Sequence, residues 1–286
     1  MNIVGLIKTM RPKQWTKNLI LFAAVLFSNH LFDFRFLKLS IVGFFLFCIF
    51  SGSVYIVNDL VDREKDKIHP KKCMRPIASG KVSTKEAIAF LIVTLLGAFY
   101  IAYKINFVFF IIGLFYFSWV TFYSFVLKHI VILDVMSISL GFVLRALAGV
   151  VLIDVRISPW LLLCTFLLSL FLALHKRKSE MDLIGRGHKT SRKILLEYTP
   201  ELLSDMLNIV TSSTVMAYSL YTFSASGSMY MMGTIPFVIY GIFRYQYIVH
   251  KKGMGENPEL VLLSDLPLII NIILWAISCI FILYFI

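Results

Sequence analysis

An aspartate-rich stretch that follows an apolar run is the first candidate for chemistry. The stretch reads Asn58-Asp59-x-x-Asp62-x-x-x-Asp66. If a helix continues through it, the spacing places the three carboxylates on one face, and Asn58 joins the same stripe. Like charges on one stripe destabilise a helix unless a cation bridges them. Because magnesium combines one or two carboxylates with substrate phosphates, we predict that these four residues bind Mg²⁺ and that the three aspartates are catalytic.

Basic residues accompany this motif. Arg63, Lys65 and Lys67 interleave with its acids, so the alternative to a metal site is a solvated helix end with balanced charges. Arg75 follows further along the same segment. Its guanidinium could bind the phosphate oxygens that the metal leaves free, and the competing interpretation is ordinary loop charge.

A second charged cluster comes later in the chain. Lys128 stands between two apolar runs, and Asp134 opens the second of them. Lys176, Arg177 and Glu180 follow a third run. These residues could be weak pairs on the surface of a helix, or they could form the second side of a phosphate-binding site.

Arg145 lies in the middle of a long apolar run. A charged side chain at that depth is costly unless it faces a cavity or an anionic partner. We place it in the substrate cavity, with a structural pair as the alternative.

The elements that position these residues belong to a membrane protein. The 286 residues are 59% hydrophobic and 15% charged, whereas soluble domains average about 45–50% and about 25%. The apolar residues recur in runs near the length of a membrane helix. We predict an all-α, polytopic helical bundle that forms a single domain over residues 1–286. Its nine predicted spans are Asn18–His30, Phe36–Val57, Lys85–Tyr103, Phe107–Phe125, Ile130–Ile153, Pro159–Leu174, Asp205–Ser226, Met229–Val249 and Leu266–Ile286.

Charge distribution predicts the orientation. Most of the 28 Lys and Arg residues fall in the segments that share a side with the N-terminus, and positive charge marks the cytoplasmic side. We therefore place the N-terminus and the active site in the cytoplasm and the C-terminus outside the plasma membrane. Residues 1–17 are predicted to lie at the interface, with cytoplasmic loops at 58–84 and 175–204. The net charge of +12 thus marks the cytoplasmic face, and we expect no nucleic-acid partner. All of the 16 acids except Asp33 and Asp154 share this face, and such a mixture of acids and bases is what a metal-plus-phosphate site requires.

Several stretches together resemble the UbiA superfamily of intramembrane prenyltransferases. The NDLVDREKD motif (Asn58 to Asp66) is specific to the superfamily. Within it, the decaprenyl-phosphate phosphoribosyltransferase group is the closer match. The stretches that support this group in combination are RPKQWTKN (Arg11 to Asn18), YSFVLKHIVILD (Tyr123 to Asp134), LRALAG (Leu144 to Gly149), HKRKSE (His175 to Glu180) and the segment from Arg244 to Asp265. The resemblance covers nearly the whole chain.

The resemblance implies a reaction and a set of roles. Phosphoribosyl diphosphate would bind through magnesium at the aspartate motif, and a polyprenyl phosphate would attack its anomeric carbon and release pyrophosphate. Lys128 and Glu180 are then expected to join the aspartates in catalysis. Substrate-binding roles are expected for Lys17, Asn58, Arg75, Tyr123, Lys128, Asp134, Arg145, Lys176 and Arg177. Aromatic prenyltransferases carry a second DxxxD motif, and here Lys176-Arg177-x-x-Glu180 takes its place, which puts a direct transfer of their mechanism in doubt.

Two alternatives remain open on the sequence. One is an enzyme of the same fold that moves a prenyl chain from a prenyl diphosphate to an aromatic acceptor. The other is a membrane anion transporter, since charged residues at membrane depth also mark transport paths. The apolar faces that would meet lipid could equally form a homo-oligomer.

Overall fold

The computed structural model describes residues 2–70, 72–156, 158–185, 193–224, 228–252, 255 and 258–286. Every regular element in these ranges is a helix, which confirms the predicted all-α class. The chain divides into unit 1, Met1–Phe125 with Leu144–Arg156, and unit 2, Val126–Val143 with Ile157–Ile286. The predicted cytoplasmic loops include Lys71 and residues 186–192, which lie outside the described residues.

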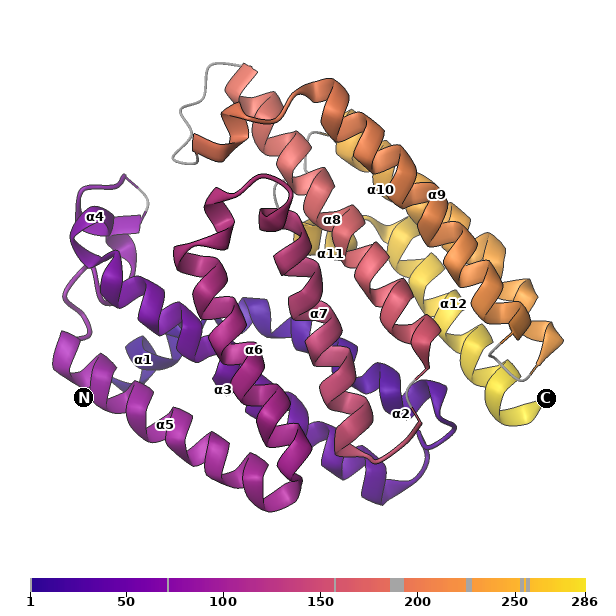
Figure 1. Cartoon of the computed structure of the whole chain (residues 1–286), viewed down its shortest axis with the longest axis horizontal. Coiled ribbons are helices and arrows are strands. Elements are labelled where there is room, and N and C mark those ends of the chain that lie inside the picture. Colours follow the sequence, from indigo (N-terminus) through magenta and orange to yellow (C-terminus); the bar gives the residue numbers. More distant parts are fainter. Residues whose placement is uncertain are drawn as a thin grey trace. The chain divides into compact units, whose positions relative to one another are not determined.

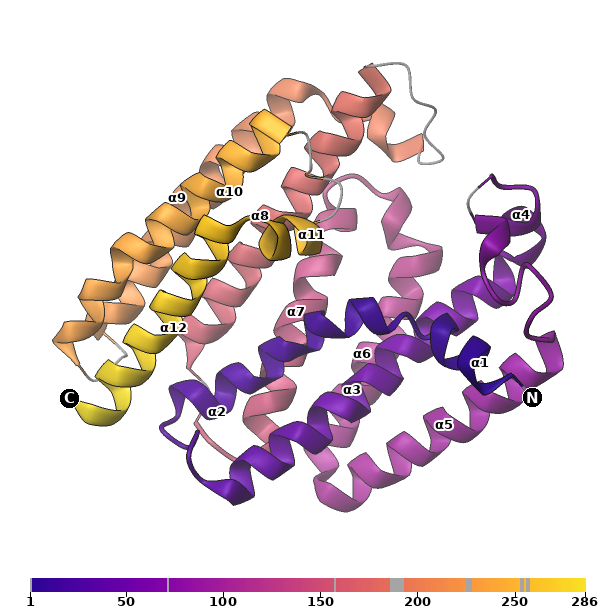
Figure 2. The same ribbon diagram turned by 180° about the vertical axis from the view of Figure 1, so that it is seen from behind.

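Unit 1 is arranged around one long helix, α3. Helices α5 and α6 pack against α3 and against each other (Figure 1), and α1 lies on α3 when seen from behind (Figure 2). The elements are α1 (Ile3–Thr9), a 3-10 helix (Pro12–Phe22), α2 (Ala23–Phe27), α3 (Phe34–Val61), α4 (Arg63–Lys67), a 3-10 turn (Lys72–Met74), α5 (Thr84–Ile105), α6 (Phe107–Phe125) and the second half of α7 (Leu133–Leu152).

Local sequence signals explain how the elements of unit 1 begin and pack. Ser83 and Glu86 form a capping box at the start of α5, which satisfies two backbone donors that the helix itself leaves free. A Cβ atom at Gly149 would overlap the carbonyl oxygen of Leu21. Only glycine therefore lets α7 lie directly on the 3-10 helix Pro12–Phe22.

Unit 2 is a second helical bundle. Helix α9 packs along α8, and α10 packs against α9 and α12, as Figures 1 and 2 show from both sides. The guanidinium of Arg244 on α10 makes two hydrogen bonds of 3.0 and 2.9 Å to the carboxylate of Asp265, which also caps α12. The elements are the first half of α7, a 3-10 turn (Leu127–His129), α8 (Pro159–Gly185), a 3-10 helix (Lys193–Leu196), α9 (Pro200–Ser224), a 3-10 helix (Met229–Thr234), α10 (Ile235–Lys252), α11 (Pro258–Ser264) and α12 (Leu266–Phe285).

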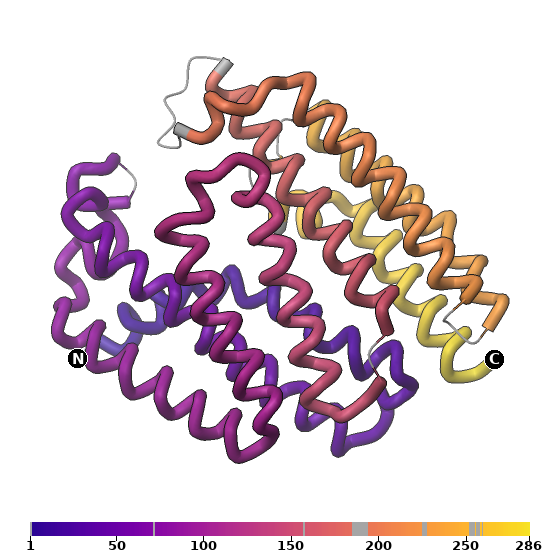
Figure 3. Tube along the Cα trace, viewed as in Figure 1, coloured from indigo at the N-terminus to yellow at the C-terminus, as the bar shows by residue number. Residues whose placement is uncertain are grey.

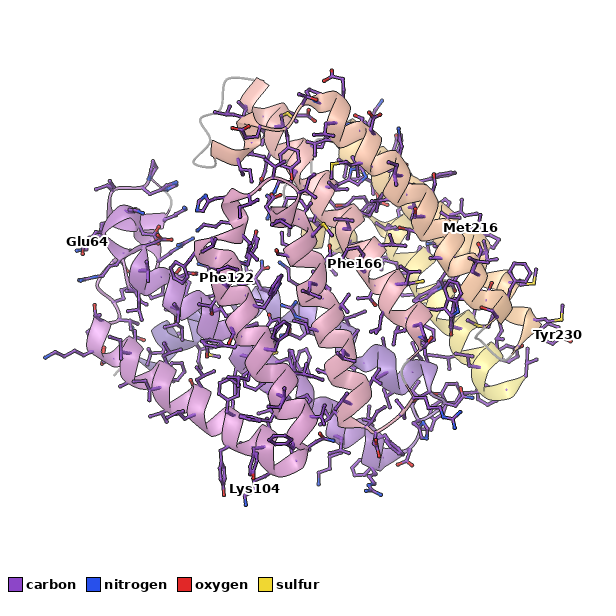
Figure 4. All side chains as sticks on the ribbon, in the orientation of Figure 1. Glu64, Lys104, Phe122, Phe166, Met216 and Tyr230 are labelled. Atoms are coloured by element: carbon purple, nitrogen blue, oxygen red, sulfur yellow. The ribbon has the colours of Figure 1, made fainter. Side chains whose placement is uncertain are left out.

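Within the described residues, six helices are long and apolar enough to cross a membrane: α3, α5, α6, α7, α8 and α12. They coincide with six of the nine predicted spans. Their outer faces are apolar, as Val93 (71% exposed) and Leu96 (63% exposed) illustrate on α5, and such faces suit contact with lipid. Figure 4 shows Glu64 just beyond the end of α3 and Lys104 at the far end of α5, so these two charges lie outside the apolar stretch of the unit.

The count of nine spans is not confirmed. The predicted span Asn18–His30 is wrong as a single helix, because the chain follows a 3-10 helix to Phe22 before the short α2. Asn18 explains part of this departure, since its side chain turns inward to hydrogen-bond in the core. The predicted spans Asp205–Ser226 and Met229–Val249 correspond to α9 and to a 3-10 helix followed by α10, and Ser226 lies outside the described residues.

Helix α8 extends well beyond the predicted span Pro159–Leu174. It continues to Gly185, and the Cα trace in Figure 3 shows it as one continuous coil. The first part of the segment predicted as loop 175–204 is therefore helical. This places Lys176, Arg177 and Glu180 on the last turns of α8.

Candidate active site

The aspartate motif lies where α3 ends and α4 begins. Helix α3 ends at Val61, and Asp62 forms the junction with φ −85° and ψ 5°. The backbone ladder still bridges the junction, because the Asp62 N–H donates to Asn58 and the Asp66 N–H donates to Asp62. Asp59 and Asp66 consequently lie on one side, and their side chains are only 2% and 3% exposed.

One guanidinium links these two buried carboxylates. Arg75 Nη1 lies 3.1 Å from Asp59 Oδ1 and 2.6 Å from Asp66 Oδ2. The backbone of the loop fixes Arg75 locally, since its carbonyl accepts a hydrogen bond of 2.8 Å from the Ser79 N–H. Arg75 therefore contacts the aspartate motif directly, and its predicted binding of phosphate oxygens stays a prediction.

A second guanidinium, which the sequence did not indicate, comes from the N-terminal segment. Arg11 Nη2 lies 2.6 Å from Asp59 Oδ1, and its guanidinium carbon lies 4.5 Å from the centre of the Tyr55 ring. The backbone of Arg11 is left-handed, with φ 53°, a conformation uncommon outside glycine. Packing on its N-terminal side holds it there, because Leu6 of α1 and the adjoining Met10 are buried in a cluster that includes Ile56, Ile77 and Val82.

The donor set fits magnesium bound together with a phosphate. No group of three or more His, Cys, Asp or Glu side chains in the described part of the chain is close enough to hold one metal, so the predicted three-carboxylate face is not assembled. Asp62 is half-buried and makes no ion pair with a described residue. Magnesium needs only one or two carboxylates when substrate phosphates supply further oxygens. Asp59 and Asp66 are close enough to contact the same cationic nitrogen, Arg75 Nη1, so the two carboxylates could also bind one magnesium ion together with a phosphate.

Other predicted residues of unit 1 lie on the elements around α3. Asn58 Nδ2 donates a hydrogen bond of 3.1 Å to Ser124 Oγ at the end of α6, which links the motif to the turn of α6 that also bears Tyr123. Tyr123 and Lys17 are half-buried. Their predicted contacts with substrate stay predictions.

Arg145 is part of a buried polar network in unit 1. It is 7% exposed, its Nε donates to Asn18 Oδ1 at 2.7 Å, and its Nη2 donates to the Tyr116 hydroxyl at 2.5 Å. Asn18 in turn lies 3.3 Å from both Cys48 Sγ and Ser51 Oγ. Arg145 thus joins α7 to α6 and to the 3-10 helix, which supports the structural alternative for this residue.

Three residues of the second predicted cluster, Asp134, Arg177 and Glu180, form a hydrogen-bonded network in unit 2. Arg177 Nε donates to Asp134 Oδ2 at 2.7 Å, and Arg177 Nη1 donates to Glu180 Oε2 at 2.7 Å. Asp134 is fully buried and Arg177 is 1% exposed. The Tyr198 hydroxyl donates to Asp134 Oδ1 at 2.6 Å. The sequence patterns did not indicate Tyr198 as part of this cluster.

The lysines of the second cluster occupy less buried positions. Lys128 and Lys176 are half-buried, Lys128 in the 3-10 turn Leu127–His129 and Lys176 on α8. Lys178 Nζ donates to Ser204 Oγ on α9 at 3.0 Å. At this end of α8, Arg177 Nη1 also lies 2.7 Å from Glu180 Oε2, three residues further along the helix. That the second cluster forms the second side of a phosphate-binding site stays a prediction.

These features define a multi-pass helical membrane protein in which buried carboxylates meet arginine side chains at the end of α3. The model of the UbiA prenyltransferase family matches residues 19–284. The chain belongs to this family and is a transferase of the UbiA superfamily.

Curated relatives cover nearly the whole chain. A decaprenyl-phosphate phosphoribosyltransferase of Mycolicibacterium smegmatis is 34% identical over 96% of this chain and 90% of its own length. The protein of that name from Corynebacterium glutamicum is 35% identical, with coverages of 95% and 84%. The one from Mycobacterium tuberculosis is 32% identical, with coverages of 96% and 92%.

A solved structure confirms the fold. A UbiA homolog from Archaeoglobus fulgidus bound to GPP and Mg²⁺ superposes with a TM-score of 0.71 and covers 98% of this chain and 99% of its own. At 21% sequence identity, this likeness shows the helical architecture alone.

Proposed function

We propose that this chain is a magnesium-dependent polyprenyl-phosphate phosphoribosyltransferase. The observation that carries the proposal is the 32–35% identity, over nearly the full chain, to relatives named decaprenyl-phosphate phosphoribosyltransferase. The substrates are phosphoribosyl diphosphate and a polyprenyl phosphate, and the products are polyprenyl-phosphoryl-ribose 5-phosphate and pyrophosphate.

The reaction exchanges one bond at the anomeric carbon of the ribose. The bond from this carbon to the diphosphate oxygen breaks, and the electron pair leaves with pyrophosphate. A phosphate oxygen of the lipid forms the new bond. Because this nucleophile is already anionic, no strong general base is required.

Residues of unit 1 suit the diphosphate. Asp59 and Asp66 would hold magnesium, with Asp62 and Asn58 beside them, and magnesium when bound supplies positive charge that stabilises the leaving diphosphate. Arg75 would bind phosphate oxygens, because a guanidinium presents a planar fork of donors that matches them. Arg75 is partly exposed, and the buried carboxylates of Asp59 and Asp66 hold its guanidinium in place for this role.

Residues of unit 2 suit the remaining phosphates. Lys128 and Lys176 are half-buried cations that can reach an anionic group at lower desolvation cost than the buried Arg177. Asp134, Arg177 and Glu180 already satisfy one another, so we assign them to holding the end of α8 and the start of α7 in place.

The site is proposed to face the cytoplasm, where water-soluble sugar diphosphates are found. This orientation rests on the lysine and arginine distribution. Fusions at the C-terminus test it. Alkaline phosphatase fused there should be active, and green fluorescent protein should be dark; the opposite pair of results would reverse the topology.

The reaction is tested with purified protein, labelled phosphoribosyl diphosphate and a polyprenyl phosphate. Label is expected in the lipid fraction when magnesium is present, with the product mass confirmed by mass spectrometry. Prenyl transfer to an aromatic acceptor is the second candidate, because the fold relative from Archaeoglobus fulgidus is bound to GPP. If a prenyl diphosphate and a hydroxybenzoate give product while no label enters the lipid, the ribosyl assignment is wrong.

A further inference from the structure

The turn Val131–Leu133, which follows the 3-10 turn that carries Lys128, has an unfavourable backbone conformation. Ile132 has φ 69°, and the Leu133 N–H donates to the Val131 carbonyl at 2.8 Å across it. A hydrogen bond that spans a single residue defines a γ-turn. The form in which the central residue has a positive φ is rare and strained. A β-branched residue at positive φ is a genuine outlier.

Surrounding contacts must maintain such a conformation, and Tyr198 provides the most direct one. The Ile132 N–H donates to the Tyr198 hydroxyl at 2.8 Å, and the same hydroxyl donates to Asp134 Oδ1 at 2.6 Å. Tyr198 is 4% exposed. One hydroxyl therefore ties the strained residue to the buried start of α7.

The network behind Tyr198 extends to α8. Asp134 also accepts from Arg177 Nε on α8, at 2.7 Å, and Arg177 donates on to Glu180. Burial and the hydrogen bond to Asp134 raise the pKa of Tyr198, so the phenol keeps the proton that it donates. Both neighbours of the hydroxyl would lose a buried partner if it were removed.

We propose that Tyr198 is a positioning residue that fixes the turn through Ile132 and thereby sets the place of Lys128. Lys128 lies four residues before Ile132, in the preceding 3-10 turn, where the His129 N–H donates to the Val126 carbonyl and the Ile130 N–H donates to the Leu127 carbonyl. The proposal rests on the proposed function, because that function makes Lys128 a ligand of a substrate phosphate.

Tyr198→Phe removes the hydroxyl and keeps the ring. Hydrogen–deuterium exchange in the peptide covering residues 126–133 should become faster in this variant. KM for phosphoribosyl diphosphate should rise about tenfold while kcat changes less, because a misplaced cation weakens phosphate binding. Tyr218→Phe is the matched control: its hydroxyl bonds to Thr234 and Trp275 in the same unit, and neither readout should move.

Two further variants separate positioning from a general loss of structure. The double variant Lys128→Ala with Tyr198→Phe should have the same KM for phosphoribosyl diphosphate as Lys128→Ala alone, because Tyr198 acts on substrate binding only through Lys128. Adding Ile132→Gly to Tyr198→Phe should lower the raised KM most of the way back to the wild-type value, since glycine adopts a positive φ without strain. Ile132 is 42% exposed, so its truncation leaves no core cavity.

Unchanged exchange at residues 126–133 in Tyr198→Phe would overturn the proposal. So would additive losses in the double variant, or absence of rescue by Ile132→Gly. If the wild-type protein transfers no phosphoribose at all, the proposed function fails, and the exchange comparison between Tyr198→Phe and Tyr218→Phe still decides whether Tyr198 fixes the turn.

Discussion

Arg75 contacts Asp66 through the same guanidinium nitrogen that reaches Asp59, at 2.6 and 3.1 Å. A cation bound by both carboxylates would have to replace this nitrogen. Phosphate oxygens give the guanidinium another partner of equal charge-assisted strength. The geometry therefore predicts that metal and diphosphate bind together.

We expect Mg²⁺ alone to bind the wild-type protein weakly, and to bind at least about tenfold more tightly in the presence of pyrophosphate, a difference of about 1.4 kcal/mol. Isothermal titration calorimetry of the detergent-solubilised protein measures both affinities. Arg75→Gln should strengthen binding of Mg²⁺ alone and weaken that of pyrophosphate. Arg63→Gln is the control, since Arg63 pairs at 3.5 Å with the exposed Glu64. Equal Mg²⁺ affinities with and without pyrophosphate in the wild type would contradict the coupling.

Asp59 and Asp62 should respond differently to removal of their charge. Both Asp59→Asn and Asp62→Asn should lower turnover by roughly 100-fold or more, a loss typical of removing a group that stabilises the transition state. Asp59→Asn should also lower stability, by about 1 kcal/mol or less because Arg11 and Arg75 are partly solvated. Asp62 has no ion pair with a described residue, so Asp62→Asn should leave the thermal midpoint unchanged. Near-normal turnover in both variants would show that Asp59 and Asp62 do not hold a catalytic magnesium ion.

Arg145→Lys tests whether the buried network of unit 1 needs a guanidinium. Lysine keeps the charge and loses the fork that reaches Asn18 and Tyr116 together. Stability should fall by about 1.5–3 kcal/mol, the range for a hydrogen bond to a charged group, as measured by thermal unfolding in detergent. Arg156→Lys, which changes an arginine outside this network, serves as the control. A variant with wild-type stability and a raised KM would instead support the cavity role that the sequence predicts for Arg145.

Sequence patterns found the features that depend on neighbouring residues. Apolar runs near membrane length indicated the six long apolar helices, and local spacing brought Asp59 and Asp66 together. Contacts between distant residues were not readable in this way: Arg11 meets Asp59 across 48 positions and Tyr198 meets Asp134 across 64. The 3-10 course of Pro12–Phe22 was also missed, in part because the side chain of Asn18 makes buried bonds to Cys48 and Ser51, which are distant in the sequence. Asp62 was assigned to one face with its neighbours, but α3 ends at that point.

Arg177 shows how burial changes an expectation. From sequence, Arg177→Ala should raise the KM for the sugar diphosphate more than it affects folding. The structure places Arg177, 1% exposed, against the fully buried Asp134, so the alanine variant would leave a buried carboxylate without its counter-charge. We therefore expect a loss of about 3–5 kcal/mol in stability, the cost typical of breaking one side of a buried pair.

The double variant Arg177→Met with Asp134→Asn separates the charge effect from packing. Removing both charges should recover most of the stability, because a buried pair contributes little over apolar groups of similar volume, and the amide oxygen introduced at position 134 would still accept from Tyr198. Thermal unfolding in detergent and the yield of membrane-inserted protein measure the recovery. If Arg177→Ala instead retains the wild-type thermal midpoint and only KM rises, Arg177 contacts substrate and the structural assignment is wrong.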